Sequence, residues 1–128
     1  MTLTPTKSVL IVDDNAFIRH ALCELFEEAD FEVSGEAENG REAIKKAPEL
    51  RPDLIVLDLL MPVMNGLDAA RVLKRLMPTV PLIMYSAFGD KFAKRQAQLI
   101  GISEVVSKSE HSSALIHKAR GLLHATAA

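Results

Sequence analysis

The pattern of apolar and polar residues along the chain predicts five strands, each followed by a helix. Three of the strands are apolar on both faces: residues 9–12, 54–57 and 80–85. Strands of this kind lie in the middle of parallel sheets, where helices cover both sides. We therefore expect these three strands to form the centre of one sheet.

Two further stretches have the pattern of edge strands. Residues 31–37 alternate with period two, which places four small or apolar side chains on one face: Phe31, Val33, Gly35 and Ala37. A strand with one solvated face is typical of the edge of a sheet. Residues 103–107 form a shorter and less apolar strand, which is expected at the opposite edge.

Apolar residues at helical spacing follow every strand. Asn15 is expected to cap the first helix, and Gly101 to end the fourth, which begins at Asp90. The second helix is expected to end at Pro48, and the third to turn Leu76 inward. Strands that alternate with helices favour right-handed crossovers, so the predicted fold class is α/β: a doubly wound, five-stranded parallel sheet in the order 2-1-3-4-5.

Length and composition indicate one globular domain over residues 1–128, with a core of about 8–123. The net charge of -2 gives no electrostatic case for binding nucleic acid or a membrane surface. The single cysteine, Cys23, is expected to be a small core or half-buried residue in a reducing compartment. Because neither a signal peptide nor a 20-residue apolar run is seen, we expect a soluble, cytoplasmic domain.

Polar residues follow four of the predicted strands at the point where each strand ends: Asp13 and Asp14, Asp58, Ser86, and Lys108. The carboxyl ends of parallel strands meet at one rim of the sheet, where ligands bind in doubly wound folds. Clustered carboxylates need either protons or a cation, and all-oxygen ligands favour Mg²⁺. A cation, an ammonium and a hydroxyl around a carboxylate suit phosphoryl transfer, with Asp58 as the nucleophile.

The motifs that carry this chemistry resemble those of a known family. They are residues 9–14 (VLIVDD), 52–62 (PDLIVLDLLMP) followed by Asn65-Gly66, 85–87 (YSA) and 106–108 (VSK). From Ser8 to Leu123 the chain resembles the receiver domains of bacterial two-component response regulators, the CheY-like family. The resemblance implies a flavodoxin-like fold and a signalling domain that catalyses its own phosphorylation without being a turnover enzyme.

The resemblance also implies a role for each site residue. Asp58 would accept a phosphoryl group from the phosphohistidine of a sensor histidine kinase or phosphotransfer protein. Asp13, Asp14, Asp58 and the backbone carbonyl of Leu60 would bind Mg²⁺, while Ser86 and Lys108 would bind phosphoryl oxygens. Phosphorylation would switch a face made by helix 4, strand 5 and helix 5, which binds a downstream effector or a second copy in a phosphorylation-dependent homodimer.

The sequence departs from the family pattern at several positions. Val105 stands where the family often has an aromatic switch residue. If an aromatic residue reports the state in this chain, the candidates are Tyr85 and Phe88. Ser109 replaces the usual proline after the lysine, so no cis bond is assumed there. Leu60 and Phe88 are apolar where many relatives are polar, and we predict that they shield the acyl phosphate from water and lengthen its life.

Other polar residues are expected to be structural. Asp53 lies at the amino end of its strand, on the rim opposite Asp58, and is interpreted as a strand boundary. The four histidines have no metal-ligand spacing and are expected to be solvated helix residues: His20, His111, His117 and His124.

Three other functions are alternatives to the phosphoacceptor. A nucleotide or flavin binder is disfavoured because the chain has neither a G-x-G-x-x-G nor a Walker A sequence. A haloacid-dehalogenase-like phosphatase is disfavoured because residues 58–60 do not fit its D-x-D motif. A pseudo-receiver that binds partners without phosphorylation remains the main alternative, because Val105 and Ser109 depart from the family pattern.

Overall fold

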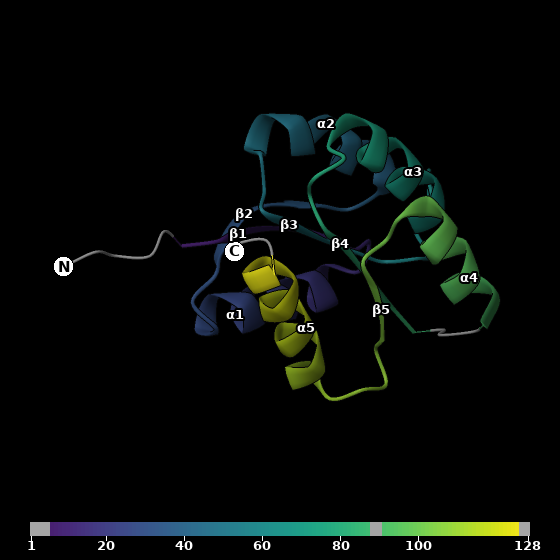
Figure 1. Ribbon diagram of the computed structural model, residues 1–128. Helices are drawn as coiled ribbons and strands as arrows, with labels where there is room; N and C mark the ends of the chain where they lie inside the picture. The colour runs from purple at the N-terminus through teal and green to yellow at the C-terminus, as the bar shows by residue number, and fades with distance from the viewer. Residues whose placement is uncertain (1–5, 88–90, 126–128) are drawn as a thin grey trace.

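The computed structural model describes residues 6–87 and 91–125, and only the backbone of residues 91–93 and 124–125. In chain order the elements are β1 (Ser8–Val12), α1 (Ala16–Glu28), β2 (Glu32–Ala37), α2 (Gly40–Leu50), β3 (Leu54–Leu57), α3 (Gly66–Leu76), β4 (Leu82–Ser86), α4 (Lys91–Ile100), β5 (Glu104–Ser107) and α5 (Ser112–Ala125). The strands form one parallel sheet in the order β2-β1-β3-β4-β5 (Figure 1). The predicted fold class, strand order and edge strands are confirmed.

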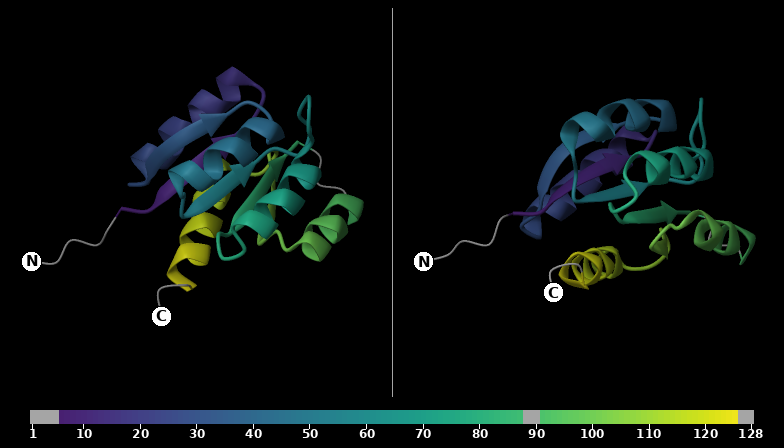
Figure 2. Two further views of the ribbon diagram at one scale, coloured as in Figure 1. Left: turned by 90° about the horizontal axis from the view of Figure 1, so that it is seen from above. Right: turned by 45° about the horizontal axis from the view of Figure 1, so that its top comes forward.

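Helices cover both faces of the sheet. Helices α1 and α5 lie on one side, and α2, α3 and α4 on the other (Figures 1 and 2). Residues of the central strands alternate between the two cores: Val9, Ile11, Leu54 and Val56 pack toward α1 and α5, and Leu10, Val12, Ile55 and Leu57 toward the other three helices. Both sets are fully buried, which explains why these strands read as unbroken apolar runs.

Strand β2 does not keep one buried face, and this part of the prediction is wrong. Its pairing with β1 slips by one residue at Ser34, where Val9 pairs with Val33 but Leu10 pairs with Gly35. One extra residue reverses the alternation of side chains. Phe31 and Val33 therefore pack in the core under α1 and α5, whereas Ala37 packs in the opposite core.

Two predicted features of the helices also need correction. Helix α2 continues through Pro48 to Leu50. Pro48 lies in the last turn, where its ring removes one backbone donor, and the helix ends two residues later. Leu76 is 51% exposed, because it is the last residue of α3 and lies beyond the edge of the core.

The helix caps at Asn15 and Gly101 are as predicted. The Asn15 side chain accepts a hydrogen bond from the Ile18 N–H at 3.1 Å. Gly101 has φ +98°, and the Ile102 and Gly101 N–H groups donate to the carbonyls of Ala97 and Gln98. This pair of bonds is the Schellman motif that ends many helices. The predicted helix start at Asp90 lies outside the described residues.

The residues expected to be structural have scaffold roles where they are described. Cys23 is buried, and Asp53 accepts hydrogen bonds from the Ser8 N–H (2.8 Å) and hydroxyl (3.3 Å) at the amino-terminal rim. His20, His111 and His117 are exposed, and the side chain of His124 lies outside the described part. His111 is not a helix residue as expected, because it lies just before α5 begins at Ser112 and its Nδ1 accepts a hydrogen bond from the Ser113 N–H at 3.1 Å. Among the described residues, no helix has the length and apolar character needed to cross a bilayer.

Candidate functional site

Three carboxylates converge at the carboxyl-terminal rim of the sheet. The Asp13 N–H donates to the Ala37 carbonyl at 3.1 Å, and the Asp58 N–H to the Val12 carbonyl at 2.9 Å, so the strand pairing continues to the first residue after β1 and β3. Asp14 follows on the exposed side. One oxygen from each of Asp13, Asp14 and Asp58 lies within 4.8 Å of the others. The structure thus brings together the three carboxylates that the sequence placed at one rim.

Lys108 reaches this carboxylate cluster from the far edge of the sheet. Its Nζ donates to Asp13 Oδ2 at 3.0 Å and lies 3.4 Å from Asp58 Oδ1. Its backbone N–H donates to the Ser86 carbonyl at 2.7 Å, which continues the pairing of β4 with β5. The ammonium side chain is only 18% exposed, so water screens these two ion pairs little.

Burial and charge shift the proton affinity of Asp58 and Lys108. Burial, followed by the negative charge of Asp13, raises the pKa of the Asp58 carboxyl, and the Lys108 ammonium offsets only part of this. Burial alone would lower the pKa of Lys108, but its hydrogen bond to Asp13 and the charges of Asp58 and Asp13 outweigh burial and raise it. The ammonium therefore stays charged, and Asp58 is a more basic carboxylate than a surface aspartate.

Ser86 and Leu60, the remaining predicted site residues, lie in different environments. Ser86 is the last residue of β4, not a loop residue as predicted, and is 1% exposed. Leu60 is 56% exposed in the loop after Asp58. The predicted metal contact of its carbonyl stays a prediction, and Phe88, the second predicted shielding residue, lies outside the described residues.

The loop between Asp58 and α3 has a strained and tightly packed backbone. Val63 has φ +70°, and the Met64 N–H donates to the Pro62 carbonyl at 2.7 Å, so these three residues form a γ-turn with positive φ at its centre. A β-branched residue rarely adopts this conformation. The Gly66 N–H donates to the Leu59 carbonyl at 2.8 Å, and a Cβ on Gly66 would overlap the Asp58 carbonyl. Gly66 belongs to a sequence motif, whereas no pattern in the sequence indicates the positive φ at Val63.

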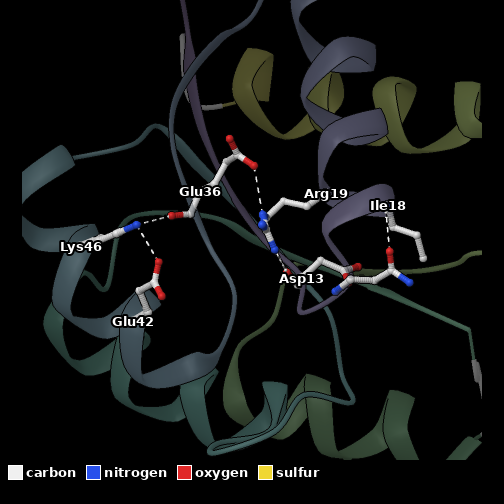
Figure 3. Close-up of polar contacts among 7 residues, drawn as sticks. Asp13, Ile18, Arg19, Glu36, Glu42 and Lys46 are labelled. Atoms are coloured by element: carbon white, nitrogen blue, oxygen red, sulfur yellow. Dashed lines mark hydrogen bonds and ion pairs between the residues drawn. The ribbon is translucent and has the colours of Figure 1, made fainter.

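Arg19 supports the acidic cluster from behind, and the sequence analysis missed it. Its Nη1 donates to the Asp13 carbonyl at 2.8 Å, while its Nε donates to Glu36 Oε1 at 3.0 Å (Figure 3). Lys46 in turn donates to the Glu36 carbonyl at 2.7 Å and to Glu42 at 2.6 Å. These contacts tie α1, β2 and α2 to the residue that begins the site.

The ligand set at this rim suits a divalent metal ion. Three carboxylates and one ammonium leave two net negative charges, which one divalent cation would neutralise. Carboxylate oxygens are the donors that Mg²⁺ prefers, and Mg²⁺ is commonly held by one or two carboxylates and several waters. The half-exposed position of the cluster leaves room for such waters, since Asp14 is exposed while Asp13 and Asp58 are buried.

Comparison with known proteins agrees with this architecture. The sequence model of the response regulator receiver domain family matches residues 9–120. The chain is 40% identical over 110 residues to the chemotaxis protein CheY of Thermotoga maritima, covering 86% of this chain and 92% of CheY. It is 38% identical over 108 residues to a protein-glutamate methylesterase/protein-glutamine glutaminase of Archaeoglobus fulgidus, covering 84% of this chain but 31% of that protein.

The fold also agrees with that of a solved relative. The crystal structure of the response regulator domain of Thermotoga maritima CheB superposes with a TM-score of 0.86 at 31% identity, covering 94% of this chain and 98% of that domain. Sequence motifs, strand order and solved relatives therefore lead to one assignment. The chain belongs to the response regulator receiver domain family, a family of signalling domains.

Proposed function

We propose that residues 1–128 form a single receiver domain that accepts a phosphoryl group on Asp58. The observation that carries the proposal is the Lys108 ammonium held between the buried carboxylates of Asp13 and Asp58, at 3.0 and 3.4 Å. A fixed ammonium beside a buried carboxylate is suited to a reaction in which negative charge develops on transferred oxygens.

The proposed transfer is a displacement at phosphorus. A carboxylate oxygen of Asp58 bonds to the phosphorus of a phosphohistidine on the donor protein, and the bond between phosphorus and the imidazole nitrogen breaks. The imidazole leaves with its electron pair and takes a proton from water. Lys108 and Ser86 would bind the oxygens of the transferred group. Mg²⁺ would be held by the carboxylates of Asp13, Asp14 and Asp58 and by the backbone carbonyl of Leu60. Bound Mg²⁺ supplies positive charge against the phosphoryl oxygens.

Phosphorylation would change the position of Lys108 and so the face beside it. Lys108 directly follows β5 and precedes α5, so its movement toward a phosphoryl group would reach the α4–β5–α5 face first. This face has a groove of about 300 Å³ lined by Val105 among other residues. We propose that a downstream effector, or a second copy in a phosphorylation-dependent homodimer, binds there. Moving the equilibrium between the inactive and active states of this face from 1:99 to 99:1 needs about 5.5 kcal/mol of differential binding.

The phosphodonor would approach the rim that carries Asp58. Three large apolar side chains are exposed around it: Phe17 (86%), Leu60 (56%) and Val63 (71%). Phe17 lies in the first turn of α1, and the other two lie in the loop after Asp58. We propose that they contact the histidine-bearing kinase or phosphotransfer protein. We also propose that Leu60 and Phe88 shield the acyl phosphate from water. An acyl phosphate half-life of seconds in the isolated domain would contradict this shielding.

Incubation with acetyl phosphate followed by intact-mass measurement tests the proposal. We expect the mass to rise by one phosphoryl group in Mg²⁺ and to stay unchanged with a chelator or in Asp58→Asn. Asp53→Asn, at the opposite end of the same strand, is the matched control and should be phosphorylated like the wild type. No gain in any of these proteins would favour the alternative, a pseudo-receiver that binds its partners without phosphorylation.

A further inference from the structure

Tyr85 stands between Asp58 and Lys108 on the same face of the sheet. Leu57 pairs with Met84, so Asp58 and Tyr85 are the next neighbours across β3 and β4, and Tyr85 pairs with Val106 across β4 and β5. Lys108 lies two residues beyond Val106 and therefore on the same face. Asp58, Tyr85 and Val106 thus form one row, and the Lys108 side chain must cross Tyr85 to reach Asp58.

The contact between the two side chains agrees with this placement. Lys108 Nζ lies 5.9 Å from the centroid of the Tyr85 ring, within the range of a cation–π interaction. The ring belongs to the core under α1 and α5 and is 9% exposed, so its position is fixed by packing. The lysine side chain is instead long and flexible. The rigid ring therefore helps to fix the path of the lysine side chain, whose ammonium Asp13 and Asp58 bind.

We infer that Tyr85 is a positioning residue that directs the Lys108 ammonium onto Asp13 and Asp58. The inference rests on the proposed function for its consequence, since an ammonium held over Asp58 is in place before the phosphoryl group arrives. Without the ring, the lysine side chain can turn away from the carboxylates into water. Tyr85 itself touches neither the donor nor the transferred group in this account.

Substitutions of the ring test this role through the rate of phosphorylation by acetyl phosphate. We expect Tyr85→Leu to lower the rate about two- to fivefold, the change expected for a partly exposed cation–π contact. Tyr85→Phe keeps the ring and should restore the wild-type rate. Phe31→Leu is the matched control, because Phe31 is a similarly buried aromatic residue of the same core, 8% exposed, at the opposite rim. An equal loss in Phe31→Leu would overturn the inference and show a general effect of packing.

A double-mutant cycle tests the contact without any phosphorylation. Urea unfolding is measured for the wild type, Tyr85→Leu, Lys108→Met and the double variant. We expect Tyr85→Leu to lower the unfolding midpoint more when Lys108 is present than in the Lys108→Met background. Equal shifts in both backgrounds would overturn the inference. If acetyl phosphate fails to modify even the wild type, the proposed function fails, and this cycle alone still decides whether Tyr85 positions Lys108.

Discussion

Replacing Asp58 by asparagine should stabilise the folded protein, although it removes an ion pair. The Asp58 carboxylate lies near two others, each within 4.8 Å, and 3.4 Å from the Lys108 ammonium. At an effective dielectric of 20, each repulsion amounts to about 3.5 kcal/mol and the attraction to about 5 kcal/mol. Water screens the exposed Asp14, so the two repulsions exceed the attraction only slightly. The burial of the charge adds to them.

We therefore expect Asp58→Asn to raise the free energy of unfolding by about 1 to 2 kcal/mol at neutral pH. The raised pKa of Asp58 gives the pH dependence. When a folded-state pKa is raised, the destabilisation by the ionised group is present above that pKa and absent below the unfolded value, which is about 4. The advantage of Asp58→Asn should therefore shrink as the pH falls through the raised pKa.

Urea unfolding without Mg²⁺, at neutral and acid pH, measures this difference. Asp53→Asn is the matched control, because Asp53 accepts two hydrogen bonds from Ser8 and is not one of the three clustered carboxylates. We expect that variant to lose about 1 kcal/mol. Adding Mg²⁺ should stabilise the wild type more than Asp58→Asn, because the variant lacks one ligand. An Asp58→Asn protein less stable than the wild type at neutral pH would refute the reasoning.

Three further predictions concern the surroundings of the site. Gly66→Ala should lower the free energy of unfolding in urea by about 2 kcal/mol or more and should slow phosphorylation, because the added Cβ would overlap the Asp58 carbonyl and lie 2.9 Å from Leu59 Cα. Gly121→Ala is the control and should stabilise the protein, because a Cβ there would have nothing within 4 Å. Arg19→Gln should lower the free energy of unfolding by about 1.5 kcal/mol or more, because it breaks a hydrogen bond to the Asp13 carbonyl. Arg71→Gln breaks only a surface ion pair with Asp68 and should lower it by under about 0.5 kcal/mol. Equal losses would contradict the role given to Arg19. Cys23, whose thiol pKa burial raises to about 11, should react with a disulfide reagent only after unfolding; rapid reaction of the native protein would contradict its burial.

The centre of the fold and the acidic cluster could be predicted because each rests on a local pattern. Runs such as residues 54–57 indicate strands buried on both faces, and the topology then brings Asp13 and Asp58 to one rim. The slip at Ser34 could not be predicted, because a bulge leaves the alternation of residue types unchanged and alters only which partner each residue meets.

The supporting contacts of the site could not be predicted from the sequence either. Arg19 belongs to no motif, and the motif that includes Tyr85 does not indicate its contact with Lys108. Both roles depend on distances to Asp13 and Lys108 that only the packed structure sets. Pro48 shows a further limit, since the helix continues past it to Leu50 although its ring removes a backbone donor.

Chemical trapping of the phosphorylated residue tests the central claim most directly. Borohydride reduces an aspartyl phosphate to homoserine, so peptide mapping after phosphorylation and reduction identifies the residue that was modified. The account predicts homoserine at position 58 in a Mg²⁺-dependent yield, and unmodified aspartate at Asp13, Asp14 and Asp53. Homoserine at another aspartate, or a phosphoryl group that resists borohydride on a serine or histidine, would contradict it.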